Sequence, residues 1–341
     1  MYAGKRTLVT GGTGSFGQTM VRRMLAADVA EVRVLSRDEG KHDQMRVELA
    51  DPRVRFYVGD VRDYLSVERA CRDVDMVFHA AALKQVPQSE ANPGECVRTN
   101  VVGTENVCRA AEESGARVVL LSTDKAVYPI NAMGMTKAMM EKVALSHGLN
   151  NPHARTVVSC VRYGNVMYSR GSVIPLFVRQ LTAGKPITLT HPRMTRFMMS
   201  LAESVDLVEY AFSRAEQGDL FIRKAPACTL ADLVTALGNL FGLRPHVEVI
   251  GIRHGEKMSE SLASREELAR AIDGGAYFRI PADNRDLNYG LYFDEGNPEG
   301  RPPVDYDSHT TTRLDVAGVE RLLLTLPEIQ AELGGAARAV A

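Results

Sequence analysis

The sequence is poor in cysteine. Its five cysteines are odd in number and nowhere form a CxxC pair, which argues against a disulfide framework and against a zinc site. We therefore predict no bound metal, and reduced cysteines that serve mainly in packing. They are Cys71, Cys96, Cys108, Cys160 and Cys228.

The sequence also lacks an excess of either charge and a long apolar run. Its 41 basic and 42 acidic residues are spread along the chain and leave a net charge of −1, so nothing in it attracts nucleic acid or an anionic membrane. No apolar stretch reaches the roughly 18 residues that a membrane span needs. We expect a globular, cytoplasmic protein that binds neither nucleic acid nor membrane.

Six short runs rich in β-branched residues alternate with helical patterns in the first half of the chain. Between Arg6 and Tyr163 these runs are RTLVT, EVRVLS, VRFYV, MVFHA, RVVLLS and TVVSCVRY. Their rhythm is typical of βαβ units. It predicts an α/β fold of the Rossmann type, with a doubly wound parallel sheet and helices on both faces.

The pattern becomes irregular beyond Asn165, where prolines separate short elements. We place an NADP-binding Rossmann domain at residues 1–165 and a smaller C-terminal α/β substrate domain at 166–201 and 227–341. The segment of about 202–226 holds a helix and a strand that we expect to return to the main sheet. A final helix is expected at VAGVERLLLTL, and the polar stretch before it is typical of a lid, an interface arm or disorder.

The first predicted strand ends in TGGTGSFG, and a helical pattern starts inside this motif. Glycines at Gly11, Gly14 and Gly17 allow a tight turn, close approach of the backbone to a pyrophosphate, and close packing of helix on strand. The helix N-terminus adds free N–H groups. Because the motif stands at a junction of strand and helix, it predicts dinucleotide binding.

The second strand does not end in the carboxylate that would bind a ribose 2′-hydroxyl. Ser36 and Arg37 stand there, with Lys41 one turn further, which favours a 2′-phosphate and hence NADP. The alternative is that Asp38 or Glu39 turns inward and NAD is used. The residues that we expect to line the cofactor site are Gly11, Thr13, Gly14, Ser15, Phe16, Gly17, Ser36, Arg37, Lys41, Asp60, Val61, Ala80, Ala81, Ala82, Ser122, Lys137, Tyr163, Asn165 and Val166.

The fifth strand ends in Ser122-Thr123-Asp124-Lys125, and the next helix carries MGMTK. Short-chain dehydrogenases need a tyrosine four residues before a lysine, on one helix face. Here Met133 stands four residues before Lys137, and a thioether has no proton to exchange. Asp124 and Lys125 are the obvious replacements, although a surface ion pair is the alternative. For Lys125 to act as a base near neutrality its pKa must fall, and we expect burial to lower it.

Further motifs complete a pattern that covers nearly the whole chain: SRDE, HAAALKQVP, STDKA, RYGNV, SRGSVIP, MTRF and RHGEK. Together they resemble the inverting UDP-N-acetylglucosamine 4,6-dehydratases of the extended short-chain dehydrogenase/reductase superfamily. The chain is most similar to their capsular-polysaccharide branch, in which methionine likewise replaces the tyrosine.

This resemblance implies a reaction on UDP-N-acetylglucosamine. Hydride leaves C4 for NADP⁺, water is lost across C5 and C6, hydride returns to C6, and C5 is inverted. Carried over by position, Lys125 is the base at C5, Asp124 the acid at the C6 hydroxyl, and Thr123 the partner of the C4 oxygen, while Lys137 holds the ribose. The group that deprotonates the C4 hydroxyl stays open between Lys125 and Thr123, as does epimerisation at C3.

The resemblance also implies a substrate site and an assembly. The residues that it assigns to the UDP-sugar are Lys84, Asn165, Thr195, Arg196, Arg253 and Glu256. A segment of about 286–312 resembles an arm that embraces a neighbouring subunit, so we expect a homo-oligomer, either a hexamer or one built from dimers. The alternatives are a UDP-sugar 4-epimerase, a ketone reductase that consumes NADPH, and a noncatalytic nucleotide-binding protein.

Overall fold

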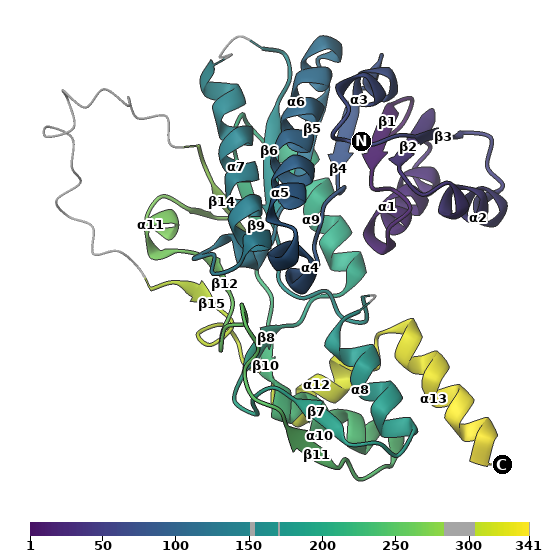
Figure 1. Ribbon diagram of the computed structural model, residues 1–341, viewed down its shortest axis with the longest axis vertical. Coiled ribbons are helices and arrows are strands. Elements are labelled where there is room, and N and C mark those ends of the chain that lie inside the picture. The colour runs from purple at the N-terminus through teal and green to yellow at the C-terminus, as the bar shows by residue number, and fades with distance from the viewer. Residues whose placement is uncertain (151–153, 170, 283–303, 341) are drawn as a thin grey trace, which may run out of the picture.

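The computed structural model describes residues 1–150, 154–169, 171–282 and 304–340 (Figure 1). Among these residues, no helix is long and apolar enough to cross a membrane, and no group of three or more His, Cys, Asp or Glu side chains is placed to hold a metal ion. All five cysteines are free and buried, as their predicted packing role requires.

A nine-stranded sheet forms the main layer, in the order β13-β14-β9-β6-β5-β4-β1-β2-β3. The seven strands from β9 to β3 run parallel, and β13 and β14 are antiparallel additions beyond β9. The predicted doubly wound parallel sheet is confirmed. The strands are β1 (Arg6–Thr10), β2 (Glu31–Ser36), β3 (Val54–Val58), β4 (Met76–His79), β5 (Arg117–Leu121), β6 (Val158–Arg162), β9 (Leu220–Arg223), β13 (Ile272–Asp273) and β14 (Tyr277–Ile280).

Helices cover both faces of this sheet (Figure 1). Along β5, Val118 and Leu120 pack into one core while Val119 and Leu121 pack into the other, which explains the unbroken apolar run. Helices α3 (Tyr64–Cys71), α6 (Gly103–Ser114) and α7 (Ala132–Asn150) cover the first face, and α1 (Ser15–Ala26), α2 (Glu39–Leu49) and α9 (Leu201–Arg214) the second. A π-helical turn (Val97–Val102) leads from the short helices α4 (Val86–Ala91) and α5 (Pro93–Cys96) into α6.

The remaining elements form a smaller part of the fold, below the main sheet in Figure 1. It has its own apolar core, in which α8, α10, α12 and α13 pack together with β7 and β10. Its elements are β7 (Ile187–Leu189), β8 (Thr195–Phe197), β10 (Ala227–Thr229), β11 (Val247–Val249), α8 (Val173–Thr182), α10 (Leu230–Phe241), α12 (Val316–Leu323) and α13 (Pro327–Val340). The helix α12 is thus followed by a further helix, which we did not predict.

We expected residues 227–341 to belong entirely to the substrate domain. Part of this range instead packs on the Rossmann part. Strand β14 pairs with β9, and Leu262, Ala263 and Ile280 join a core of the Rossmann part. Helix α11 (Arg265–Leu268) is tied to the Rossmann part by the ion pair of Glu267 with Arg162, and β12 (Ser261–Ala263) pairs with β15 (Tyr306–Asp307). Strand β14 covers the sheet edge that β9 would otherwise expose.

Most of the predicted arm of 286–312 lies outside the described residues. Its described portion, residues 304–312, packs on its own chain: the Tyr306 ring lies 5.6 Å from that of Phe197, and Ser308 is fully buried.

A buried ion-pair network joins the sheet to α7 and α11. The Arg162 guanidinium, at the end of β6, donates to both carboxylate oxygens of Glu141 at 2.7 and 2.6 Å and to both of Glu267 at 2.7 and 2.8 Å. Arg162 is 4% exposed, so the two carboxylates neutralise a cation that water cannot reach.

Replacing Arg162→Leu should therefore destabilise the fold strongly, because it leaves two carboxylates in the interior without a partner. We expect a loss of about 3–5 kcal/mol in the free energy of unfolding. Urea denaturation followed by circular dichroism measures it. As a control, Arg22→Gln removes an exposed ion pair with Glu48 and should cost at most about 1 kcal/mol. Equal losses in the two variants would contradict this account.

Candidate functional site

The glycine-rich turn has the geometry that the sequence predicted. Gly11 has a φ of 66°, and a Cβ there would lie 2.8 Å from the backbone nitrogen of Ala81. A Cβ at Gly17 would lie 2.5 Å from the Cα of Gly12. Helix α1 starts after Gly14, which offers no side-chain cap, so the N–H groups of the first turn stay available for an anion. The turn therefore fits a pyrophosphate.

Two aromatic rings and an amide border the other end of this turn. The ring of Phe16 stacks on that of Tyr163 at 5.5 Å and contacts Phe78 at 5.2 Å. Asn165 follows Tyr163, and its Oδ1 atom is buried with no hydrogen-bond partner among the described residues. Such an atom calls for a ligand or an ordered water.

The carboxyl end of β2 presents hydroxyls and an imidazole rather than a carboxylate. The Ser36 hydroxyl lies 3.1 Å from that of Thr13 and 2.7 Å from Nε2 of His42, a buried residue that our sequence analysis did not single out. Asp38 does not turn toward this group, since its carboxylate accepts a hydrogen bond from the Lys41 N–H and caps α2.

Arg37 and Asp60 meet at the same edge. Their side chains lie 3.7 Å apart, and Asp60 is also paired with Arg62 at 2.6 Å. The Arg37 side chain is 56% exposed, so its guanidinium remains open to an anionic ligand. Val61 is buried against Gly103.

Asp124 and Lys125 form a partly buried ion pair in a 3₁₀ turn (Asp124–Ala126) at the carboxyl end of β5. The Lys125 ammonium donates to Oδ1 of Asp124 at 3.0 Å, and the Thr123 hydroxyl donates to the same oxygen at 2.7 Å. The other oxygen, Oδ2, is buried and has no partner among the described residues. Asp124 is 1% exposed, so the pair is not the surface ion pair that the alternative interpretation required.

The predicted lowering of the Lys125 pKa is wrong for this structure. Burial by itself lowers the pKa of the ammonium, but the carboxylates of Asp124 and Glu260 outweigh burial and raise it above its ordinary value. The prediction failed because it relied on burial and left out the neighbouring carboxylates, of which Asp124 has the larger effect and Glu260 the smaller. In the structure described here, Lys125 is therefore protonated at neutral pH.

Helix α7 packs directly on this turn through Gly134. A Cβ at that position would lie 2.2 Å from the carbonyl oxygen of Lys125, so only glycine permits the contact. Its neighbour Met133 is 4% exposed and places a thioether where related enzymes have a phenol. Lys137, one turn further, donates to the Leu121 carbonyl at 2.6 Å, and burial lowers its pKa to about 8.

Two buried side chains that we did not predict hold these elements together. Glu141 accepts a short hydrogen bond from the Ser122 hydroxyl and thereby ties the end of β5 to α7. Asn100 accepts from the Leu83 N–H at 2.8 Å and donates to the Leu83 carbonyl and to the hydroxyl of Thr136. It fixes the Ala80–Leu83 loop against α7. Glu141 lies in the helix that carries the MGMTK motif and Asn100 lies outside the motifs, and neither residue was assigned a role from the sequence.

A third missed residue, Glu260, lies beside the ion pair. Its Oε1 atom is 3.7 Å from Lys125 Nζ and 4.0 Å from Arg196, and its Oε2 atom is 3.8 Å from Lys257 Nζ. The motif RHGEK ends three residues before it, so it escaped notice.

The predicted substrate residues occupy different surroundings. Arg253 and Lys84 are exposed, on the RHGEK loop and on the loop after β4. Glu256 has a buried Oε2 atom without a partner among the described residues. Thr195 is fully buried, and its hydroxyl pairs with Ser308 at 2.8 Å, so its side chain stabilises the fold and does not face a ligand. That prediction is corrected.

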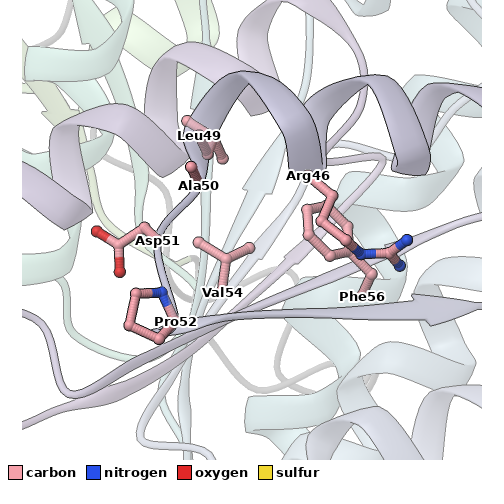
Figure 2. Close-up of a pocket in the computed structure, with 7 residues that line it drawn as sticks. All are labelled: Arg46, Leu49, Ala50, Asp51, Pro52, Val54 and Phe56. Atoms are coloured by element: carbon pink, nitrogen blue, oxygen red, sulfur yellow. The ribbon is translucent and has the colours of Figure 1, made fainter.

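The hollow in Figure 2 lies away from this site, at the end of α2 and along the edge strand β3. It encloses about 400 Å³ and is lined by Arg46, Leu49, Ala50, Asp51, Pro52, Val54 and Phe56. None of these belongs to the predicted site, and the Arg46 guanidinium lies over the Phe56 ring at 5.0 Å.

Known proteins that resemble this chain in sequence and fold include enzymes that act on nucleotide sugars. Curated relatives called UDP-glucose 4-epimerase, from Rickettsia akari and Rickettsia bellii, are 52% identical over 98% of this chain and 100% of their own length. The structure of Pen from Bacillus thuringiensis is similar with a TM-score of 0.86 and 34% identity, over 95% of this chain and 98% of that one. DesIV, a dTDP-glucose 4,6-dehydratase from Streptomyces venezuelae with NAD bound, has a TM-score of 0.67 and 26% identity, over 74% and 86%.

The family described as polysaccharide biosynthesis protein matches residues 7–282, and its C-terminal companion matches residues 283–330. The chain therefore belongs to the polysaccharide biosynthesis protein family, with the extended short-chain dehydrogenase/reductase fold of the nucleotide-sugar dehydratases and epimerases.

Proposed function

We propose that the protein is an NADP-dependent UDP-N-acetylglucosamine 4,6-dehydratase that inverts C5. One observation carries this proposal: an ammonium and a carboxylate lie 3.0 Å apart at the carboxyl end of β5, next to a buried Met133 in place of the usual phenol. The carboxyl ends of parallel strands are where ligands bind in sheets of this kind.

The number of proton-transferring groups favours a dehydratase over an epimerase. A 4-epimerase moves a proton only at the C4 oxygen, whereas loss of water across C5 and C6 needs a base for the C5 proton and an acid for the C6 oxygen. The adjacent side chains of Lys125 and Asp124 supply both.

The cofactor that fits this site supplies hydride chemistry, by accepting hydrogen from C4 of the sugar and returning it. Gly11, Gly14 and Gly17 would hold its pyrophosphate, and Lys137 would hold the ribose next to the nicotinamide. Ser36, Arg37 and Lys41 would bind a 2′-phosphate, which supports NADP, although the DesIV structure contains NAD.

Proton transfer within the pair prepares it for elimination. When a proton moves from Lys125 Nζ to Asp124 across their hydrogen bond, the pair becomes a neutral amine and a carboxylic acid. The amine then takes the C5 proton, while the acid gives its proton to the departing C6 hydroxyl, which leaves as water. The pair ends as ammonium and carboxylate, so the charges with which it began are restored.

Thr123 connects the same carboxylate to the C4 oxygen in this proposal. Its hydroxyl donates to Oδ1 of Asp124 at 2.7 Å, which holds it beside the pair, and in this proposal it passes the proton that leaves the C4 hydroxyl on to water. The pair then still holds the single proton that elimination needs. This relay takes the place of the absent phenol.

The second candidate is a UDP-glucose 4-epimerase, because relatives at 52% identity carry that name. Both candidates use the same fold and begin with oxidation at C4, so the product alone separates them.

We expect purified protein, incubated with UDP-N-acetylglucosamine and NADP⁺, to form a product lighter by one molecule of water. In heavy water that product should carry deuterium at C5, because the carbanion formed when hydride returns to C6 takes up a proton that has exchanged with the solvent. Mass spectrometry and proton NMR measure both. UDP-glucose serves as the parallel substrate, and an isobaric product from either sugar would favour the epimerase. Stoichiometric loss of NADPH absorbance would indicate a simple reductase.

Removal of the amine should stop dehydration without releasing the cofactor. For Lys125→Ala we expect a decrease in kcat of about 10²- to 10⁴-fold, the usual contribution of a general base, with NADP binding retained in a fluorescence titration. Lys142→Ala removes an exposed lysine of α7 and should leave the rate unchanged. Normal turnover of the first variant would exclude Lys125 from the reaction.

Two neighbouring substitutions in α7 should differ strongly in their effect on the reaction rate. Met133→Leu conserves volume and apolarity, so we expect a rate within a few-fold of the wild type and a stability loss below about 1.5 kcal/mol. Gly134→Ala forces the Lys125 carbonyl away from α7 and misplaces the ion pair, which should lower kcat by about 100-fold. Steady-state kinetics on both variants checks this. A silent Gly134→Ala, or an inactive but folded Met133→Leu, would refute the account.

A further inference from the structure

Glu260 is a buried carboxylate surrounded by charged groups. It is 2% exposed, and its carboxylate lies within 4.0 Å of three cationic side chains, Lys125, Arg196 and Lys257. None of these contacts is a close hydrogen bond, and Oε2 has no hydrogen-bond partner among the described residues. Burying a carboxylate with so few direct bonds is costly, which points to a role other than stability.

The backbone around Glu260 is fixed from two sides. Its N–H donates to the Ser308 hydroxyl at 3.0 Å, and its carbonyl accepts from the Ser308 N–H at 2.8 Å. Ser308 is in turn bonded to the hydroxyl of Thr195. These hydrogen bonds hold the backbone of Glu260 in a position from which its carboxylate reaches the Asp124–Lys125 pair.

The charges that face one another in this cluster come from three segments of the chain. Lys125 is faced by Asp124, Glu260 and Arg196, and Glu260 is faced by Asp124, Lys125, Arg196 and Lys257. Burial and the nearby Asp124 carboxylate raise the pKa of Glu260, while the three cations oppose this rise. In its charged form, Glu260 favours the protonated form of Lys125.

We propose that Glu260 is a positioning residue that keeps the mobile proton on the Asp124–Lys125 pair. This inference rests on the proposed function for its catalytic meaning, because the elimination described above needs a pair that holds one proton. If Lys125 lost that proton to water, Asp124 would have none to give to the C6 hydroxyl. Glu260 therefore keeps one proton on the Asp124–Lys125 pair at the pH at which the enzyme acts.

The sign of the effect follows from the charges. Replacing Glu260→Gln removes one negative charge next to Lys125, so the pKa of Lys125 falls and the ammonium gives up its proton at lower pH. Activity requires that proton, so the alkaline limb of the pH–rate profile should move to lower pH. A purely structural role would lower stability or kcat and leave that limb in place.

The first test needs no substrate. Competitive labelling of lysines with acetic anhydride between pH 8 and 10, followed by peptide mass spectrometry, reports the neutral fraction of Lys125. We expect E260Q to label Lys125 about tenfold faster than the wild type, and Glu260→Asp, whose carboxylate is withdrawn by one methylene, to label it roughly two- to threefold faster. Exposed lysines in the same digest are the internal reference.

Glu267→Gln is the matched control, since it also removes an ion-paired and largely buried carboxylate, but one that pairs with Arg162 and not with Lys125. It should leave the labelling of Lys125 unchanged. Unchanged labelling in folded E260Q, with folding checked by circular dichroism, would overturn the proposal. If E260Q does not fold, unchanged labelling in E260D has the same meaning.

The second test is the pH–rate profile of water loss from UDP-N-acetylglucosamine. We expect the alkaline limb of E260Q to lie below that of the wild type, with E260D between them. An unmoved limb refutes the role of Glu260 while leaving the dehydratase intact. Faster labelling without any dehydration by the wild type refutes the proposed function and leaves the electrostatic role of Glu260 standing.

Discussion

The close approach of α7 to the Asp124–Ala126 turn is the constraint on which the candidate site depends. Only the missing side chain of Gly134 lets the helix reach the Lys125 carbonyl, and this contact sets α7 against the turn that carries the ion pair. Glu141 secures the same arrangement from the helix side, through Ser122 and Arg162. A small error in this contact would displace the turn that carries Asp124 and Lys125.

The sheet was predictable because its strands are buried on both faces. Continuous apolar runs such as RVVLLS, separated by helical patterns, leave few other folds, and the glycine-rich turn then marks the nucleotide end of the sheet. Strands β13 and β14 escaped prediction because they are short and carry no run of this kind. Their position depends on pairing with β9, about 50 residues earlier in the chain, which no local pattern encodes.

The site was predictable only where one segment supplies the chemistry. Asp124, Lys125 and Met133 lie within ten residues of one another, so a motif reveals them together. Glu260 reaches the same pair from far along the chain, and it adds to the effect of Asp124 in raising the pKa of Lys125. The prediction that Thr195 contacts the substrate failed for another reason. A motif marks a position but does not tell whether the side chain there faces the ligand or the core.

The same fold serves epimerases and dehydratases, so the difference between them must lie in a few side chains. In the proposed reaction, a thioether replaces the phenol and Thr123 passes the C4 proton on to water. The Asp124 carboxylate is then left to serve C6, and the adjacent amine serves C5. An enzyme that merely returned hydride to C4 would need neither the amine nor the second buried carboxylate of Glu260. Their joint presence at the end of β5 is therefore the strongest physical argument for elimination over epimerisation.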